Sequence, residues 1–373
     1  MSVARLSGSS NKNVRNIGGG VVLLLVFVLL LAFNFGSTPV SGIPTKPAAR
    51  DALLQNILNT TLGFERILVI NLPERTDHHD GMVLAGDVTG LHIEFVPGIR
   101  GEAVADKVLP AHFDTNLGAA QRGSWRAHIN SISRVIENGW SSALIMEDDI
   151  DWDVRLKQQL QDVAVASRYL TSNPTSTGRV QMKDARHSTR STHSPYGDDW
   201  DILWLGHCGM KFPETNAAVL YQNDNTVAPI KYQESWDANE PSPLKDLPEH
   251  TRVYTTVSEG VCSLAYAVSQ QGARKLLFAL GLRRLTMPFD LMLREWCQGN
   301  TEVPGYLPKC ISVLPQLFDH HRRVGPKDFD SEIADPNGLY RDQRYTLNIR
   351  QSVRMNMEKL LSGRTDFEDQ WPD

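Results

Sequence analysis

Three consecutive carboxylates, Glu147, Asp148 and Asp149, directly follow the short apolar run at 142–146. An unbroken apolar run of this length is typical of a strand that is buried on both faces of a parallel sheet. The carboxylates then lie at the carboxyl end of the strand, which is where open α/β sheets bind their ligands. Adjacent acids in this position suit Mg²⁺ or Mn²⁺ with a nucleotide diphosphate, and an acidic, solvated turn accounts for the same residues equally well.

The rest of the chain alternates between strand-like segments and segments with helical spacing. Strands are predicted at 66–71 and 201–206, and apolar residues recur at helical spacing in 124–138. This alternation predicts an α/β domain with a mainly parallel central sheet. The chain of 373 residues is long enough for one large domain, which we place at 63–373. The polar segment 172–199 is predicted to be an insertion that is either disordered or functional.

The beginning of the chain differs because residues 17–35 are almost wholly apolar and follow three basic residues. We predict a signal-anchor transmembrane helix at 17–35, with residues 1–16 as a cytoplasmic tail. A cleaved signal peptide is the alternative, and either interpretation sends the body of the protein into the secretory pathway. Residues 36–62, rich in Ser, Thr, Pro and Ala, are predicted to form a stem. We therefore expect a single-pass type II membrane protein of the Golgi with a lumenal domain.

Two further features fit an oxidising compartment. The four cysteines permit two disulfides, and of the three possible pairings we choose Cys208 with Cys262 and Cys297 with Cys310. Asn59 begins an Asn-Thr-Thr triplet and is a candidate glycosylation site, although such triplets also arise by chance. The net charge of -5 provides no basic footprint for nucleic acid.

Four blocks of residues follow one another in a characteristic order. They are 67–75, the run from 123–128 to 147–149, 265–273, and 288–290 with Pro315. In this order they resemble glycosyltransferase family 25, which includes lipopolysaccharide and procollagen galactosyltransferases. The chain departs from the family pattern where Ser124 and Ala127 replace a cysteine and a serine, and where His78 replaces a common arginine.

The resemblance implies a GT-A-type fold, a UDP-sugar donor, often UDP-galactose, and a divalent cation, Mn²⁺ or Mg²⁺. A cation held by carboxylates neutralises the negative charge that develops on a departing sugar diphosphate. On this interpretation Asp149 is a direct metal ligand, and Asp148 is a ligand directly or through water. Glu147 faces the sheet or orients the other ligands. His320 and His321 could add a ligand for Mn²⁺, but a loop histidine pair without a metal is the simpler interpretation.

The candidates for binding the UDP-sugar lie after the first predicted strand and at the start of the helix at 124–138. They are Asn71, Leu72, Arg75, Gly123, Arg126, His128, Glu147 and Asp148. Arg75 lies at the carboxyl end of a strand and Arg126 near a helix N-terminus, which are both positions that can meet phosphate. The alternatives are two solvated arginines and, for His128, a core histidine with satisfied hydrogen bonds.

An inverting transfer needs a general base that takes the proton of the acceptor hydroxyl. Asp290 is the first candidate, because Pro288 and Phe289 hold it at the start of a predicted helix, where an ordinary N-cap aspartate is the alternative. Glu259, in a loop between two predicted strands, is the second candidate, and a solvated turn is its alternative.

These features together predict an enzyme that transfers a hexose, galactose by resemblance, from a UDP-sugar to a hydroxyl of a glycan or glycoprotein. A nucleotide-sugar hydrolase would use the same acids with water as the acceptor. A catalytically silent lumenal binding protein with the same fold is the third possibility, although buried acids without a partner are costly.

Overall fold

The computed structural model describes residues 48–173, 177–188, 191–213, 217–233, 241–301, 306–330, 333 and 339–373. The predicted cytoplasmic tail, the signal-anchor segment 17–35 and the first part of the stem lie outside these residues. Within the described part of the chain, no helix is long and apolar enough to cross a membrane. Residues Ala49–Asp373 form one unit.

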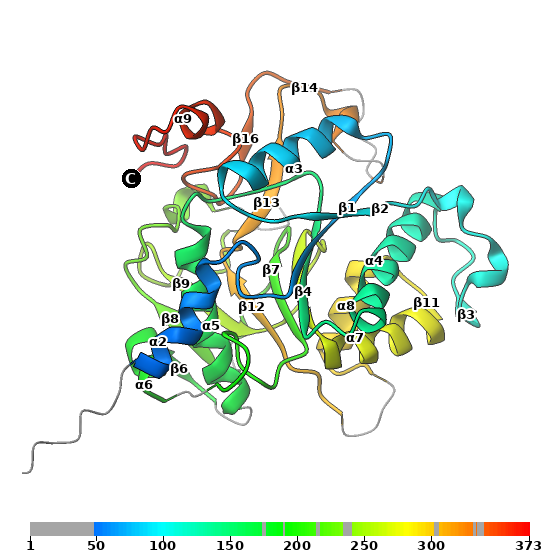
Figure 1. Ribbon diagram of the computed structural model, residues 1–373, viewed down its shortest axis with the longest axis horizontal. Helices are drawn as coiled ribbons and strands as arrows, with labels where there is room; N and C mark the ends of the chain where they lie inside the picture. Colours follow the sequence, from blue (N-terminus) through cyan, green and yellow to red (C-terminus); the bar gives the residue numbers. More distant parts are fainter. Residues whose placement is uncertain are drawn as a thin grey trace, which may run out of the picture. The chain divides into compact units, whose positions relative to one another are not determined.

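A large sheet runs through this unit (Figure 1). Along its main path the strands are, in spatial order, β2 (Glu94–Pro97), β1 (Arg66–Asn71), β4 (Ser142–Glu147), β10 (Ala265–Ser269), β7 (Ile202–Gly206), β12 (Cys310–Leu314), β9 (Arg252–Thr256), β8 (Ala218–Tyr221) and β6 (Arg179–Gln181). Off this path, β13 (Phe318–Arg322) pairs with β5 (Ile150–Trp152), β7 and β16 (Tyr345–Thr346). Two small sheets pair β3 (His112–Phe113) with β11 (Arg284–Leu285) and β14 (Gly325–Pro326) with β15 (Tyr340–Arg341).

The sheet is mixed, which corrects the expectation of a mainly parallel one. β2, β1 and β4 are parallel neighbours, but β10 runs antiparallel to both β4 and β7. β9 likewise runs antiparallel to β12 and β8. Parallel neighbours need a long crossover, usually a helix, and among the described residues no α-helix lies directly before β9 or β10 in the chain.

Helices cover both faces of the sheet. They are α2 (Ala48–Gln55), α3 (Thr76–Val88), α4 (Ala119–Glu137), α5 (Leu156–Ser172), α6 (Met182–Ser188), α7 (Gln270–Leu276), α8 (Phe289–Cys297) and α9 (Met357–Leu361), with a π-helix at Leu277–Arg283. Short 3₁₀ helices occupy Asn56–Leu58, Gly101–Ala103, Asp106–Val108, Ile230–Tyr232 and Lys327–Phe329. α4 packs with α7 and α8 on one face, and α5 lies on the other (Figure 1).

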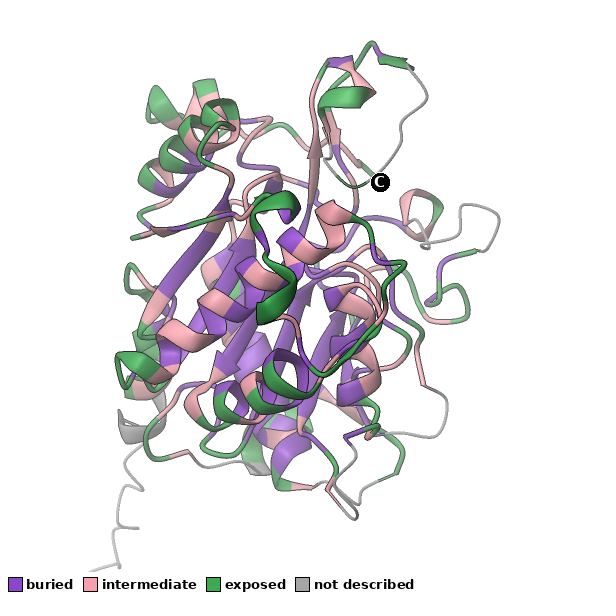
Figure 2. Ribbon diagram, turned by 90° about the vertical axis from the view of Figure 1, so that its right-hand side faces the viewer, coloured by how far each residue is buried: buried purple, intermediate pink, exposed green. Residues whose placement is uncertain are grey.

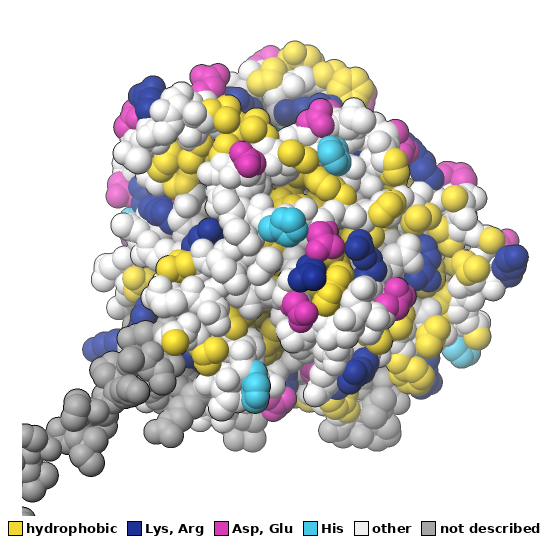
Figure 3. Space-filling model, in the orientation of Figure 1, with side chains coloured by type: hydrophobic (Ala, Val, Ile, Leu, Met, Phe, Trp, Pro, Cys, Tyr) yellow, Lys and Arg dark blue, Asp and Glu magenta, His cyan; other side chains and the backbone are white. Residues whose placement is uncertain are grey.

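Alternate residues of the central strands supply two hydrophobic cores, because successive side chains of a strand point to opposite faces. Leu144 and Met146 of β4 join the core with α5, whereas Ala143 and Ile145 join the core with α4, α7 and α8. The apolar part of β4 is thus buried on both faces, as the sequence predicts, and Figure 2 shows the strands enclosed by the helices. On the face seen in Figure 3, charged side chains of both signs are interspersed.

Two predicted boundaries change. Ile57 and Leu62 are fully buried in the core, so the described end of the expected stem belongs to the folded domain. The described part of 172–199 is also folded rather than a disordered insertion. It contains α6 and β6, which extends the sheet beside β8, and Tyr196, whose buried ring stacks on Phe64 at 4.4 Å.

Candidate active site

The three carboxylates lie at the end of β4 and in the turn that leads to β5. β5 pairs antiparallel with β13, and this register places His320 opposite Ile150. The His321 N–H also donates to the Asp149 carbonyl over 2.8 Å. This pairing brings a histidine from late in the chain beside the acids.

Glu147, Asp149 and His320 form a group that could hold a metal ion. One ligand atom from each lies within 4.8 Å of the other two, and the Asp149 Oδ2 to His320 Nε2 distance is 3.5 Å. The Asp149 Oδ1 atom is buried and has no hydrogen-bond partner among the described residues. Two carboxylates and an imidazole are a ligand set that suits Mn²⁺, and the buried Asp149 Oδ1, which has no hydrogen-bond partner among the described residues, could contact such a cation. The residues therefore fit the metal that the family resemblance implies.

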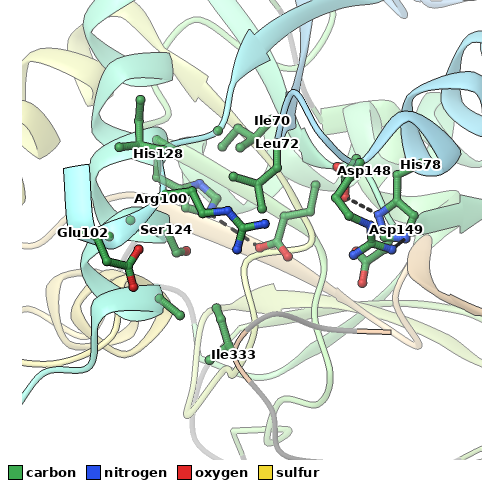
Figure 4. Close-up of a pocket in the computed structure, with 18 of the residues that line it drawn as sticks. Ile70, Leu72, His78, Arg100, Glu102, Ser124, His128, Asp148, Asp149 and Ile333 are labelled. Atoms are coloured by element: carbon green, nitrogen blue, oxygen red, sulfur yellow. Dashed lines mark hydrogen bonds and ion pairs between the residues drawn. The ribbon is translucent and has the colours of Figure 1, made fainter. Parts of the chain in front are cut away.

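Asp148 lies in the turn after β4 and points away from this group, toward Asn71 and His78. Its Oδ2 accepts a hydrogen bond from Asn71 Nδ2 at 2.6 Å. Its Oδ1 lies 2.9 Å from His78 Nδ1, a contact drawn in Figure 4. Glu147, two residues before Asp149, points to the same side as Asp149. The structure therefore groups Glu147, and not Asp148, with Asp149 among the residues that could hold a metal ion.

Glu147 is held by a buried hydrogen-bond network. Ser263 Oγ donates to Glu147 Oε1 at 2.9 Å and lies 3.2 Å from His128 Nε2. His128 Nδ1 lies 3.1 Å from the Tyr266 hydroxyl, and its ring stacks on Phe289 at 4.3 Å. Both ring nitrogens of His128 thus have a polar neighbour in the core, as the alternative interpretation from the sequence expects. Through Ser263, His128 also supports Glu147, a candidate metal ligand.

The two neighbouring histidines of β13 face opposite ways. His320 joins the acids, whereas His321 Nδ1 lies 3.1 Å from Thr346 Oγ1 and 3.8 Å from Asp151 Oδ2. His321, predicted as a possible ligand, is thus outside the group that could hold a metal. Burial lowers the pKa of His321 to about 4, so its imidazole is neutral at pH 7.

Arg322 fixes the tautomer of a neutral His320. Its guanidinium donates to His320 Nδ1 at 3.0 Å. Because a guanidinium has no acceptor, Nδ1 must accept, and the proton of a neutral His320 then sits on Nε2, the atom near Asp149. Binding a cation through Nε2 therefore requires Arg322 to turn away from Nδ1.

A cavity of about 250 Å³ lies between the acids and α4. Figure 4 shows Glu102, Ser124 and His128 on one side and His78, Asp148 and Asp149 on the other, with Leu72 and Arg100 between them. Its wall depends on close backbone contact, because a Cβ on Gly123 would lie 2.2 Å from the Ile99 carbonyl oxygen. Gly123 thus lets the loop before α4 pack against that helix.

Most residues predicted to bind the UDP-sugar line this cavity. They are Leu72, Arg75, Gly123, His128, Glu147 and Asp148. Asn71 lies behind the wall, where it holds Asp148. Arg126 is absent from the wall, because α4 turns it toward Asn130, whose Oδ1 accepts from Arg126 Nε at 2.7 Å. Arg75 donates to Asp77, and this hydrogen bond holds the pKa of Asp77 well below its ordinary value.

A second cavity, of about 580 Å³, adjoins the first and shares Glu147 and Ser124 with it. His320 and Asp290 line it, and Asp290 Oδ2 accepts from the Cys262 N–H at 2.8 Å. Glu259, the second candidate base, lines neither cavity and forms an ion pair with Lys211 at 2.8 Å. The structure therefore places Asp290, and not Glu259, in the cavity that Glu147 and His320 also line.

The structure pairs Cys208 with Cys262 and Cys297 with Cys310, the pairing chosen from the sequence. Asn59 is exposed, and its Oδ1 accepts from the Thr61 N–H at 2.8 Å. Glycosylation at Asn59 stays a prediction.

Sequence reasoning missed several residues of the site. His78 holds Asp148, Ser263 holds Glu147, and Arg322 contacts His320. His78 lies three residues after Arg75, a spacing that places both on one face of a helix and could have revealed it. Ser263 and Arg322 carry no comparable local signal, because their contacts join segments far apart in the chain.

No protein-family model matches the chain. Procollagen galactosyltransferase 1 of Danio rerio is 26% identical over 244 residues, which are 62% of this chain and 31% of that protein. Procollagen galactosyltransferase 2 of Mus musculus is 22% identical, over 75% of this chain and 35% of its own length. The inactive glycosyltransferase 25 family member 3 of Homo sapiens is also 22% identical, over 74% and 36%.

The chain thus spans about a third of the length of these relatives. One of these relatives is named inactive, and two are named galactosyltransferases. The names agree with the four ordered blocks of the sequence, and this chain is similar to the glycosyltransferase 25 family.

Proposed function

We propose that this chain is a metal-dependent glycosyltransferase with a GT-A-like domain. It transfers galactose from UDP-galactose to a hydroxyl of a glycoprotein, with inversion at the sugar carbon. The observation that carries the proposal is the group Glu147, Asp149 and His320, which lies where two cavities meet. The names of the relatives support a glycosyltransferase and a galactosyl group.

The two cavities suit the two substrates. The first cavity, walled by Leu72, the Gly98–Gly101 backbone and α4, takes the nucleoside of the UDP-sugar. The second, larger cavity contains Asp290 and takes the sugar and the acceptor hydroxyl. Glu147 lines both cavities, so the bond that breaks lies near the candidate metal ligands.

Asp149, Glu147 and His320 would hold Mn²⁺ or Mg²⁺, and the bound cation supplies charge neutralisation for the diphosphate leaving group. Asn71 and His78 fix the turn by holding Asp148, and Ser263 fixes the carboxylate of Glu147. These hydrogen bonds hold the ligands in place before substrate binds, which lowers the cost of reorganisation during the reaction.

Asp290 is the proposed general base. The Cys262 N–H donates to its Oδ2, and its Oδ1 would accept the proton of the acceptor hydroxyl in the second cavity. That hydroxyl oxygen forms the new bond to the sugar as the bond to the diphosphate breaks, which gives UDP and an inverted product.

The domain acts in the lumen of the secretory pathway, in the Golgi, on this proposal. Two disulfides in the folded domain and an exposed Asn-Thr-Thr triplet support that compartment.

The test is product analysis with the purified chain, UDP-galactose, Mn²⁺ and procollagen, the acceptor in the names of two relatives. Galactose on the acceptor, lost in the Asp290→Asn variant, supports the proposal. Free galactose with an unmodified acceptor means a hydrolase. Tight binding of UDP and Mn²⁺ without any turnover over a panel of UDP-sugars and acceptors means a silent binding protein, as the inactive relative would suggest.

A further inference from the structure

The Cys208–Cys262 disulfide lies in the wall of the second cavity, together with Glu147, Asp290 and His320. We propose that this disulfide is a positioning element of the active site, which holds the segment 262–264 against the candidate base and a candidate metal ligand at once. The proposal rests on the proposed function for its kinetic consequences.

The Cys262 end of the bond contacts the base. The Cys262 N–H donates to Asp290 Oδ2 at 2.8 Å, and the Cys262 carbonyl accepts from Trp204 Nε1 at 3.1 Å. Cys262 has a φ of +63°, which is uncommon for a residue with a side chain. The disulfide to Cys208 and the hydrogen bond from Trp204 hold this backbone in the orientation in which the Cys262 N–H donates to Asp290.

The next two residues contact the metal group. Ser263 Oγ donates to Glu147 Oε1 at 2.9 Å, and the Leu264 carbonyl accepts from the Glu147 N–H at 2.9 Å. Glu147 is therefore fixed at both its backbone and its side chain by residues that directly follow the disulfide. A displacement of Cys262 moves the partners of Glu147 and Asp290 together.

The Cys208 end completes the arrangement. Cys208 Sγ lies 3.8 Å from His320 Nδ1. The Cys208 N–H donates to the Val261 carbonyl at 2.9 Å, and the Val261 N–H donates to the Gly209 carbonyl at 3.1 Å. One covalent bond thus ties a segment beside His320 to the segment that holds Glu147 and Asp290.

The second disulfide provides a matched control within the same chain. Cys297 and Cys310 are 6% and 1% exposed, belong to the hydrophobic core, and line neither cavity. Cys208 and Cys262 are partly exposed. A mild reductant should therefore open the bond in the cavity before the bond in the core.

The experiment titrates the native chain with dithiothreitol, which gives two electrons to the disulfide and becomes a cyclic disulfide itself. Alkylation and mass spectrometry report which bond is open. When Cys208–Cys262 alone is open, we expect kcat to fall at least about tenfold and Mn²⁺ affinity, measured by calorimetry, to fall about tenfold. The far-ultraviolet circular dichroism should stay native, and removal of the reductant under air should restore kcat.

Two paired variants separate positioning from general stabilisation. Cys208→Ala with Cys262→Ala should show the same losses of kcat and Mn²⁺ affinity at a temperature where the chain is folded. Cys297→Ala with Cys310→Ala should unfold at a lower temperature but keep kcat within about twofold while folded. Unchanged kcat and Mn²⁺ affinity with Cys208–Cys262 open, or equal losses in both paired variants, would overturn the proposal.

If the proposed function itself fails, the same experiments give a different result. In that case the untreated chain transfers no sugar, while the Mn²⁺ affinity still reports whether the disulfide positions Glu147.

Discussion

Replacing Ser263 by alanine removes the one side chain that donates a hydrogen bond to Glu147 among the described residues. A hydrogen bond to a charged group contributes about 1.5–3 kcal/mol. His128 Nε2 remains 3.5 Å from Glu147 Oε1 and keeps part of the interaction, so the lower half of that range applies. A loss of about 1.5–2 kcal/mol corresponds to Mn²⁺ binding that is roughly ten- to thirtyfold weaker.

Calorimetric titration with Mn²⁺ measures this change directly, and Ser263→Thr, which keeps the hydroxyl, should retain most of the affinity. Ser312→Ala is the matched control, because Ser312 Oγ donates at 2.8 Å to the Trp204 carbonyl, away from both cavities. The control should lose about 1 kcal/mol of stability and no Mn²⁺ affinity. Equal Mn²⁺ affinity in Ser263→Ala and the unmodified chain would refute the role given to this hydroxyl.

Arg322, Asp290 and His207 each give a further testable prediction. Arg322→Gln should tighten Mn²⁺ binding about tenfold, since a glutamine oxygen can accept from His320 Nδ1 and leave Nε2 free for the cation; weaker binding by calorimetry would contradict this. Asp290→Asn should lower kcat by about a hundredfold or more with little change in the KM for UDP-galactose, and unchanged steady-state kcat would exclude Asp290 as the base. Burial lowers the pKa of His207 to about 4 from 6.5, so the unfolded chain takes up its proton first as the pH falls, and stability should drop by about 2 kcal/mol between pH 7.5 and 5. Urea unfolding at the two pH values measures this change, and the free energy of unfolding of His207→Asn should fall by about 2 kcal/mol less than that of the unmodified chain. An equal fall in the variant would show that other groups cause the loss of stability in acid.

Local patterns predicted the elements that carry the site. The apolar run before Glu147 forms β4, and the run at 66–71 forms β1, because each is long and apolar enough to fill a central strand. The same reasoning placed the acids at a carboxyl strand end and Asp290 in the first turn of α8. The positions of these strands and of this helix depend on residues that are adjacent in the sequence, so the sequence alone predicts them.

The arrangement within the site depends on contacts that a single sequence does not display. Glu147 ends β4, whereas Asp148 and Asp149 lie in a turn, and contacts with Asn71 and His78 hold Asp148 away from the other two acids. The choice of His320 over His321 is set by the register of β13 on β5. The mixed sheet likewise results from which strands pair, and pairing joins distant segments.

On the proposed function, Asp149 holds the cation needed for UDP-sugar turnover together with Glu147 and His320. The most direct measurement is the rate of UDP release from UDP-galactose, with acceptor present, as a function of Mn²⁺ concentration. The unmodified chain should show a rate that rises and saturates with Mn²⁺, and Asp149→Asn should lose at least about a hundredfold of that rate. An Asp149→Asn variant that turns over UDP-galactose as fast as the unmodified chain, at the same Mn²⁺ concentrations, would contradict the account.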